Sequence, residues 1–307
     1  MNGTSSWWQS PAAVFELLRQ LDENNFAVID GFAGNRSAHE MRDAVVSALA
    51  GDANRGGSAQ SGRVGSGEGS GSSASALRSD RSMWARPGAK LAPAIEVYVR
   101  RADDLVAALR GGAYHGDGHD ARPASAEDAA QRARLALRLT THRSDAMLAV
   151  YPRGGAKYVR HTDNVCDPVG VGSRCNGRRL TVVYYLNAPE EEQQQQEQQH
   201  DHEQRQQQGL DVERQPPRGL FASGALRLFA TGAIDSEPRV DVEPLVDRLV
   251  LFWSDARVPH AVLPTGPSAD RYATTLWYFD QEELNRANQR LQHGGSSAAQ
   301  EVRQVFE

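Results

Sequence analysis

The stretch "AMLAVYP", residues 146–152, is where the sequence changes from helical patterns to short strands. Val, Tyr and other apolar residues dominate it, and a Pro-Arg-Gly-Gly turn follows. Four more stretches of this kind come after it, and no gap between them carries a convincing crossover helix. The four are "LTVVYYLN" (180–187), "GALRLF" (224–229), "DRLVLFWS" (247–254) and "YATTLWYF" (272–279). Strands without crossover helices predict an antiparallel sandwich or barrel.

The residues before 145 predict helices that pack on one sheet of this core, which gives an α+β fold class. Ser10-Pro11 is typical of a capped helix start. "FAVID" (26–30) reads as a strand, and Ser37 with Glu40 has the spacing of a capping box that opens a second helix. We expect Gly51 to end that helix.

Two segments cannot bury a core. Residues 51–76 are rich in Gly and Ser and are expected to be mobile. Residues 189–208 are a Glu/Gln-rich insert between two strands, too polar to fold alone. Further helices are expected at 94–110 and 125–139. The predicted divisions are N-terminal supporting elements (1–50), the Gly/Ser segment (51–76), an entrance loop with helices (77–143), the strand core (144–280) and a C-terminal helix and tail (281–307).

Charge, hydropathy and cysteine content argue against a nucleic-acid-binding, membrane-spanning or secreted protein. The formal net charge is −5 over 307 residues, so the chain lacks the excess of positive charge that is typical of nucleic-acid-binding proteins. No apolar run is long enough to span a bilayer, and "MNGTSSWWQS" has no signal-peptide pattern. Cys166 and Cys175 are too few for a disulfide framework, so we expect a protein of a reducing compartment, in the cytoplasm or nucleus.

The chemistry centres on "YVRHTDNV", residues 158–165. Side chains two positions apart on an extended strand point to the same face, so His161 and Asp163 can reach one ion together. His260, which follows a strand after a short turn, is the candidate third ligand. Two histidines and one carboxylate leave coordination positions open, as in non-haem Fe(II) enzymes that bind a chelating cosubstrate and dioxygen. The plainer alternative is a solvated turn, which is how we read the similar spacings at 115–119 and 200–202.

Arg271 strengthens the metal hypothesis. It directly precedes the last strand, a short distance after His260. A guanidinium can hold a carboxylate through two parallel hydrogen bonds, as a dicarboxylate cosubstrate needs at the end that does not chelate the metal. The alternative for Arg271 is a surface charge at a strand start.

The sequence resembles the prolyl hydroxylases of the hypoxia-sensing type, which are Fe(II)- and 2-oxoglutarate-dependent dioxygenases on a double-stranded β-helix. The resemblance covers roughly residues 14–290 apart from the two low-complexity segments. The segments that carry it are "NNFAVIDGF", "LRSDRSMW", "AVYPRGGAKYVRHTDN", "VVYYLN", "GALRLF", "DRLVLFWSDARVPHAV" and "RYATTLWYFD". The Glu/Gln-rich insert and "VCDPVGVGSRCNG" (165–177) depart from the family pattern, so substrate contacts there cannot be carried over.

The resemblance implies roles for particular residues. His161, Asp163 and His260 would bind iron, and Arg271 with Tyr185 would hold the distal carboxylate of 2-oxoglutarate. The other implied positions are Tyr151 beside the cosubstrate, Met147 and Trp277 in the pocket wall, and Arg78, Asp80, Trp84 and Arg178 at the entrance loop, with Asp80 facing Arg178. Ordinary core packing is the alternative for Tyr151 and Met147.

The implied function is hydroxylation of a prolyl residue in a protein substrate, with 4-hydroxyproline, succinate and CO2 as products. Fe(II), 2-oxoglutarate, O2 and ascorbate are the implied cofactors and cosubstrates, an oxygen-sensing role is implied, and a monomer is expected. Two alternatives stay open at this point. One is a related oxygenase acting on lysine, a nucleobase or a small molecule, and the other is a non-catalytic metal- or peptide-binding module.

Overall fold

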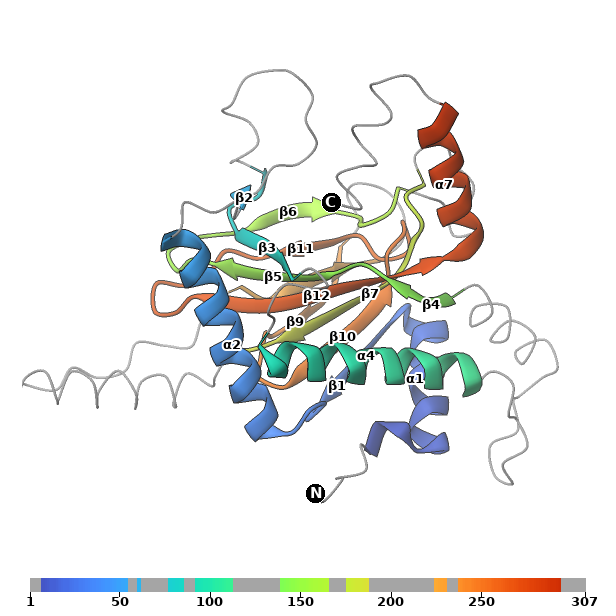
Figure 1. Cartoon of the computed structure of the whole chain (residues 1–307), viewed down its shortest axis with the longest axis horizontal. Coiled ribbons are helices and arrows are strands. Elements are labelled where there is room, and N and C mark those ends of the chain that lie inside the picture. Colours follow the sequence, from blue (N-terminus) through green and yellow to red (C-terminus); the bar gives the residue numbers. More distant parts are fainter. Residues whose placement is uncertain are drawn as a thin grey trace, which may run out of the picture.

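The structure is a computed structural model of the chain (Figure 1). It describes residues 7–54, 60–61, 77–85, 92–112, 139–165, 175–187, 224–230 and 237–293. The helix predicted at 125–139, except Leu139, and the insert at 189–208 lie outside these residues, as does most of the segment 51–76.

In the described part of the chain, twelve strands form two sheets that face each other. The strands are β1 (Phe26–Asp30), β2 (Gln60–Ser61), β3 (Arg81–Ala85), β4 (Leu139–Arg143), β5 (Ala146–Tyr151), β6 (Tyr158–His161), β7 (Arg178–Tyr185), β8 (Leu226–Phe229), β9 (Pro238–Val242), β10 (Arg248–Trp253), β11 (His260–Val262) and β12 (Arg271–Asp280). The major sheet has the order β1-β10-β7-β12-β5-β3-β2, with β4 also paired to β12, and the minor sheet has the order β6-β11-β8-β9. Every pairing between these named strands is antiparallel, as predicted.

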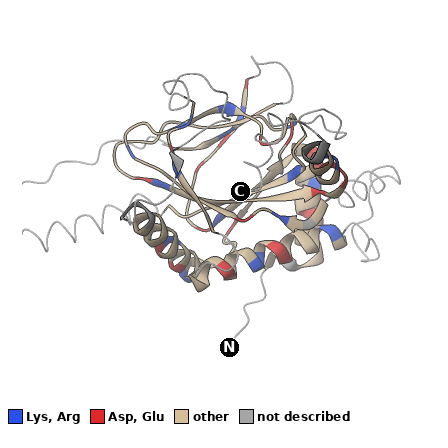
Figure 2. Ribbon diagram, turned by 45° about the horizontal axis from the view of Figure 1, so that its top comes forward, with Lys and Arg blue, Asp and Glu red and all other residues tan. Residues whose placement is uncertain are grey.

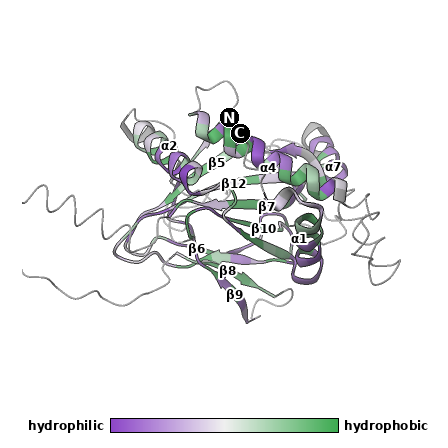
Figure 3. Cartoon of the chain, turned by 90° about the horizontal axis from the view of Figure 1, so that it is seen from below, coloured by the Kyte–Doolittle hydropathy of each residue, from purple (hydrophilic) through white to green (hydrophobic). Residues whose placement is uncertain are grey.

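Helices α1 (Pro11–Asn24), α2 (Asn35–Asn54) and α4 (Pro93–Gly112) cover one face of the major sheet, and the minor sheet covers the other (Figures 1 and 3). The other described helical elements are η1 (Trp7–Gln9) and α7 (Gln281–His293). Charged residues gather on the helices and at strand ends, while the strands are mostly uncharged (Figure 2). The site described below therefore lies between two sheets rather than under the helices. Among the described residues, no helix is long and apolar enough to cross a membrane.

Helix α1 follows its sequence signals closely. The Ser10 hydroxyl oxygen accepts a hydrogen bond from the Ala13 amide at 3.2 Å, and Pro11 opens the helix. Val14, Leu17 and Leu21 are buried on one face of the helix. Removing each of these side chains from water stabilises the folded state by roughly 1.5–3 kcal/mol.

Helix α2 differs from the prediction at both ends. It begins at Asn35 instead of Ser37, and Gly51 lies inside it. The turn before it is held by Asp247, whose two carboxylate oxygens accept from the amides of Ala33 (2.7 Å) and Gly34 (2.8 Å). A partner more than two hundred residues away replaces the local capping box, so local spacing could not locate this helix start.

The stretch "LRSDRSMW", expected to belong to an entrance loop, instead contains a strand. Residues 81–85 form β3, which pairs along its whole length with β5 of the major sheet. Two residues of the Gly/Ser segment, Gln60 and Ser61, pair with β3 in turn. Arg78 forms a bridge with Tyr158 of the minor sheet. This segment therefore connects the two sheets at one edge.

Asp247 is expected to stabilise the fold without serving the metal site. Its carboxylate, 6% exposed, also accepts a hydrogen bond from the Tyr184 hydroxyl at 2.8 Å. Asp247→Ala leaves those three donors unpaired and should lower the free energy of unfolding by about 3 kcal/mol, measured by chemical denaturation. Tyr184→Phe removes one of the three bonds and should cost about 1 kcal/mol. Equal stability of Asp247→Ala and the wild type would contradict this account of the α2 start.

Candidate metal centre

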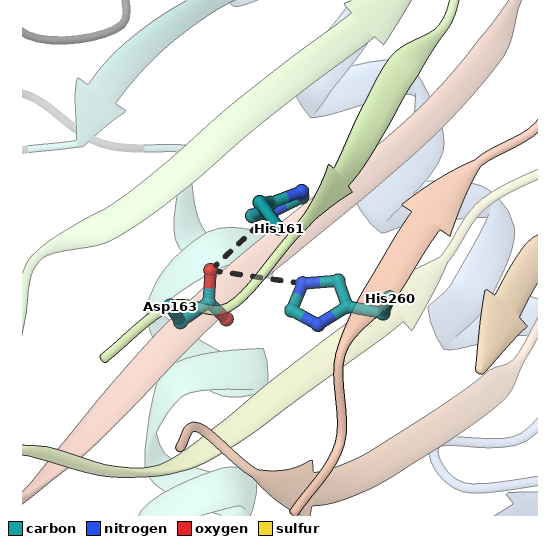
Figure 4. Close-up of side chains that lie close together, drawn as sticks. All are labelled: His161, Asp163 and His260. Atoms are coloured by element: carbon teal, nitrogen blue, oxygen red, sulfur yellow. Dashed lines mark ion pairs between the residues drawn. The ribbon is translucent and has the colours of Figure 1, made fainter. Parts of the chain in front are cut away.

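Three predicted ligands converge between the sheets. His161 ends β6 and His260 begins β11, and the two residues are directly paired across these antiparallel strands. Asp163 follows His161 by two positions. The Nε2 atoms of both histidines lie 3.7 Å from Asp163 Oδ1 (Figure 4), and the ligand atoms all lie within 4.8 Å of one another. This spacing fits one metal ion bound to all three side chains.

Hydrogen bonds orient both imidazoles in the same way. Nδ1 of His161 lies 2.8 Å from the carbonyl oxygen of Val159, and Nδ1 of His260 lies 3.0 Å from that of Val258. A carbonyl oxygen can only accept, so Nδ1 carries the hydrogen in each ring. Each Nε2 therefore presents its lone pair to the ion, as a metal-ligating histidine requires.

The protonation states suit a metal. Burial lowers the pKa of His161 well below its usual range, and the neighbouring His260 lowers it further. Burial alone raises the pKa of Asp163, but the two histidines, Arg178 and Trp277 outweigh that effect and hold this pKa below its ordinary value. At neutral pH the site therefore presents a neutral His161 and an ionised Asp163.

The two oxygens of Asp163 have different surroundings. Oδ2 accepts hydrogen bonds from Thr181 Oγ1 at 2.7 Å and from Trp277 Nε1 at 3.0 Å. Oδ1 faces the two imidazoles. With Oδ2 held by two donors, the carboxylate offers one oxygen to a metal, and more coordination positions stay open than a two-oxygen contact would leave.

Thr181 was not identified from the sequence, and Trp277 was expected only to line the pocket. The register brings them together, because Thr181 on β7 is directly paired with Trp277 on β12. A threonine that interrupts the apolar run of a buried strand is the signal that could have pointed to this role.

Tyr158 is a second residue that the sequence analysis missed. Its ring stacks on the His161 imidazole with centroids 3.6 Å apart and planes inclined by 18°. The Arg78 guanidinium carbon lies 4.9 Å from the centroid of the same ring. This stacking limits the rotation of a candidate ligand.

The predicted cosubstrate residues also come together. Arg271 is 3% exposed and is paired with Tyr151 between β12 and β5. Its guanidinium carbon lies 4.8 Å from the Tyr151 ring centroid and 5.0 Å from that of Tyr185. Its Nε donates to the Gly224 carbonyl oxygen at 2.7 Å. Gly224 has φ +79°, and a Cβ there would lie 2.9 Å from Arg271 Cδ, so glycine is required beside this arginine.

The chemistry of this corner fits a carboxylate ligand. The Tyr185 hydroxyl is buried and has no hydrogen-bond partner among the described residues. A buried polar group without a partner costs roughly 1–3 kcal/mol, and a carboxylate held by Arg271 would provide an acceptor for it. Burial raises the pKa of Tyr185 although Arg271 opposes the rise, so the hydroxyl stays protonated and can donate.

The predicted contact between Asp80 and Arg178 is wrong. Asp80 is 1% exposed and pairs with Arg78, whose Nε and Nη2 both donate to its carboxylate, the latter at 2.6 Å. Arg178 instead lies over the Trp277 ring, with 4.1 Å between guanidinium carbon and ring centroid. The reason is local, because residues 78 and 80 lie in an extended segment that turns both side chains to one side. Burial lowers the pKa of Arg178, and the Asp163 charge opposes that effect.

The remaining predicted residues lie next to one another. Trp84 on β3 is directly paired with Met147 on β5, and its ring centroid lies 5.7 Å from that of Trp277. The Arg78 Nη2 lies 3.7 Å from Met147 Sδ. Met147 therefore contacts Arg78 and lies beside Trp84.

Cys175 is buried and disulfide-bonded. This bond was not predicted, because two cysteines were expected to be too few for a disulfide framework. The other cysteine of the chain, Cys166, lies outside the described residues.

Comparison with known proteins finds relatives that are similar over part of the chain. Residues 146–279 match the model of the 2OG-Fe(II) oxygenase superfamily. The human prolyl hydroxylase EGLN3 is 37% identical over 160 residues, which are 52% of this chain and 50% of that protein. The hypoxia-inducible factor prolyl hydroxylase of Caenorhabditis elegans is 34% identical over 145 residues, which are 47% of this chain and 14% of that protein. The aligned part thus spans half or less of the length of these relatives.

A solved structure agrees over nearly the whole chain. The prolyl hydroxylase of Trichoplax adhaerens, in complex with a peptide fragment of the hypoxia-inducible factor oxygen degradation domain, has a TM-score of 0.59 and 25% identity. The match covers 93% of this chain and 99% of that chain. The expected double-stranded β-helix is thereby confirmed. Residues 146–279 thus match the 2OG-Fe(II) oxygenase superfamily, and the chain is similar in sequence and in fold to proteins named as prolyl hydroxylases.

Proposed function

We propose that this chain is an Fe(II)- and 2-oxoglutarate-dependent dioxygenase that hydroxylates a prolyl residue of a protein substrate. The observation that carries the proposal is the convergence of His161, Asp163 and His260, each oriented by its own hydrogen bonds, between two sheets. The family match and the similarity to named prolyl hydroxylases support it.

The three ligands would hold the iron, and Arg271 with Tyr185 would hold the far carboxylate of 2-oxoglutarate. Bound iron would supply the chemistry that couples reduction of O2 and decarboxylation of 2-oxoglutarate, giving succinate and CO2, to insertion of one oxygen atom into a proline C–H bond. Ascorbate is the expected reductant that sustains turnover.

The chain's own residues would position the reactants. The buried Arg271 guanidinium offers parallel donors to a carboxylate in surroundings that exclude water, which strengthens the electrostatic attraction. The Asp163 carboxylate is kept in one orientation by Thr181 and Trp277, so it does not have to reorient during turnover.

The proposed substrate is a proline within a peptide segment. A proline side chain is an apolar ring without charge, and the wall formed by Trp84, Met147 and Trp277 offers it aromatic and thioether surface. The Trichoplax relative binds a peptide fragment, which supports a protein substrate for this chain. A monomer in the cytoplasm or nucleus, acting as an oxygen sensor, remains part of the proposal.

The test is turnover of a peptide mixture. The chain is incubated with Fe(II), 2-oxoglutarate, O2, ascorbate and proline-containing peptides, and succinate and oxidised peptides are quantified by mass spectrometry. Equal amounts of succinate and hydroxyproline are expected. Succinate with oxygen on another residue would indicate a related oxygenase, and metal binding without succinate would indicate a non-catalytic module.

His161→Ala and His260→Ala should each abolish stoichiometric Fe(II) binding, because two remaining ligands hold the ion poorly in water. Metal content after anaerobic loading and desalting measures this. His142→Ala is the matched control, since His142 is exposed and contacts Gln281 instead of the site. Full metal content in either ligand variant would exclude that histidine as a ligand.

Arg271→Lys should raise the KM for 2-oxoglutarate while Fe(II) content stays at the wild-type level. An ammonium cannot make two parallel contacts to a carboxylate. Losing one charge-assisted hydrogen bond, worth about 1.5–3 kcal/mol, corresponds to a rise in KM of roughly tenfold to a hundredfold. Arg36→Lys, at an exposed position of α2, is the control. An unchanged KM in Arg271→Lys would assign the anchor to another residue.

Trp277→Phe should keep the aromatic wall but remove one donor to Asp163 Oδ2. Loss of such a contact to a metal ligand typically lowers metal affinity by tenfold or more, so a roughly tenfold rise in the Fe(II) Kd is expected. Thr181→Val removes the other donor with little change in volume and should act in the same direction. Wild-type Kd values in both variants would show that Asp163 needs no such support.

A further inference from the structure

A buried group of charges lies beside the metal centre. Glu283, in the first turn of α7, is fully buried (0% exposed), as are Arg179 and Asp255 (2% and 1%). Arg179 Nη1 lies 3.4 Å from Asp255 Oδ2 and 3.7 Å from Glu283 Oε1, and Asp255 also accepts from Arg257 Nη2 at 2.6 Å. A carboxylate is almost never fully buried unless it is paired, and even a paired one is weak evidence of added stability. Stability alone therefore does not explain why Glu283 is buried.

Glu283 reaches the segment that carries Asp163. Its Oε2 accepts a hydrogen bond from Nδ2 of Asn164 at 3.0 Å. Asn164 directly follows Asp163, and its Nδ2 also donates to the Arg178 carbonyl oxygen at 2.7 Å. The Asn164 backbone amide donates to the Ser254 carbonyl oxygen at 2.8 Å. Asn164 is thus fixed through both its side chain and its backbone.

The same network holds the backbone of Asp163. Asn176 Nδ2 donates to the Asp163 carbonyl oxygen at 2.8 Å. The Asn176 amide in turn donates to Asn164 Oδ1 at 3.2 Å. One side-chain amide, that of Asn164, therefore connects Glu283 of α7 with the residue that fixes the Asp163 peptide.

The first turn of α7 is packed against this segment as well. The Asp280 amide donates to the Gly177 carbonyl oxygen at 2.8 Å. Gly177 has φ +84°, and a Cβ there would lie 3.0 Å from Leu284 Cα, so no larger residue fits without a shift.

The sequence around Glu283 has the spacing of a capping box, yet the glutamate is used differently. Asp280 is the cap, because its Oδ1 accepts from the amides of Glu282 and Glu283, both at 3.0 Å. In a capping box Glu283 would bond back to the Asp280 amide. That amide is already bonded to Gly177, and Glu283 points to Asn164 instead.

We propose that Glu283 is a positioning residue for the metal centre, acting through Asn164 on the orientation of Asp163. Docking of α7 is thereby coupled to metal affinity, although no residue of α7 is a candidate ligand. The inference rests on the proposed metal site but on neither the prolyl substrate nor the cosubstrate.

The test compares metal affinity with stability in four variants of the full chain. Co(II) is the probe, because its visible absorption reports the ligand geometry, and thermal unfolding is followed on the same samples. Glu283→Ala should raise the Co(II) Kd on the order of tenfold and alter the Co(II) spectrum. Tenfold is the lower end of the loss of affinity seen when a residue that supports a metal ligand is removed. Glu283→Gln keeps an oxygen acceptor for Asn164 but loses the charge opposite Arg179. It should lower the Tm while its Kd stays within about twofold of the wild type.

Glu282→Ala is the matched control, since Glu282 is the exposed neighbour in the same turn and should leave both Kd and spectrum unchanged. If Glu283→Ala does not fold, Asn164→Ser removes the hydrogen bond to Glu283 together with the side-chain contacts to Arg178 and Asn176, while the ion pair of Glu283 with Arg179 remains. A rise in Kd at least as large as that expected for Glu283→Ala is then predicted. A wild-type Kd and spectrum in folded Glu283→Ala or in Asn164→Ser would overturn the inference. A wild-type chain that binds no Co(II) or Fe(II) would overturn the metal site and this inference together.

Discussion

The pairing of β6 with β11 is the constraint on which the rest of the site depends. It places His161 directly opposite His260, so that two imidazoles from different parts of the chain reach one point. A strand that slips by one residue turns every side chain to the other face. The register is kept because β11 is also paired with β8 on its other side, where His260 faces Leu228. The short strands of the minor sheet thus define the position of the metal.

The major sheet completes what the minor sheet begins. Thr181 and Trp277, neighbours on β7 and β12, donate to the Asp163 oxygen that does not face the histidines. Arg271 at the start of β12, over the Tyr151 ring, would provide the cation for a carboxylate ligand. Helices α1, α2 and α4 pack on the opposite face of this sheet, so the face toward the minor sheet carries the residues of the candidate site (Figure 3). Support from α7 through Glu283 would add a third source of rigidity.

The sequence allowed the long buried strands and the three candidate ligands to be predicted, because apolar runs and polar residues at their ends are local signals. The strands β6 and β11 were missed, since four and three residues are too few for a pattern. The start of α2 depends on Asp247, which lies more than two hundred residues away in the chain. The partner of Asp80 is an exception, because Arg78 lies only two residues away and local spacing could have indicated it. Thr181 and Tyr158 become part of the site only through cross-strand register and ring stacking. Such contacts are decided by the tertiary fold and leave little trace in local spacing.

The most direct test of the central claim follows the oxygen atom. The chain is supplied with isotopically labelled O2, 2-oxoglutarate, Fe(II) and proline-containing peptides, and the products are sequenced by mass spectrometry. The account predicts that one labelled oxygen atom appears on a prolyl ring and another in succinate, and that both are lost in Asp163→Ala. Unlabelled hydroxyproline, or label that persists without Asp163, would contradict it.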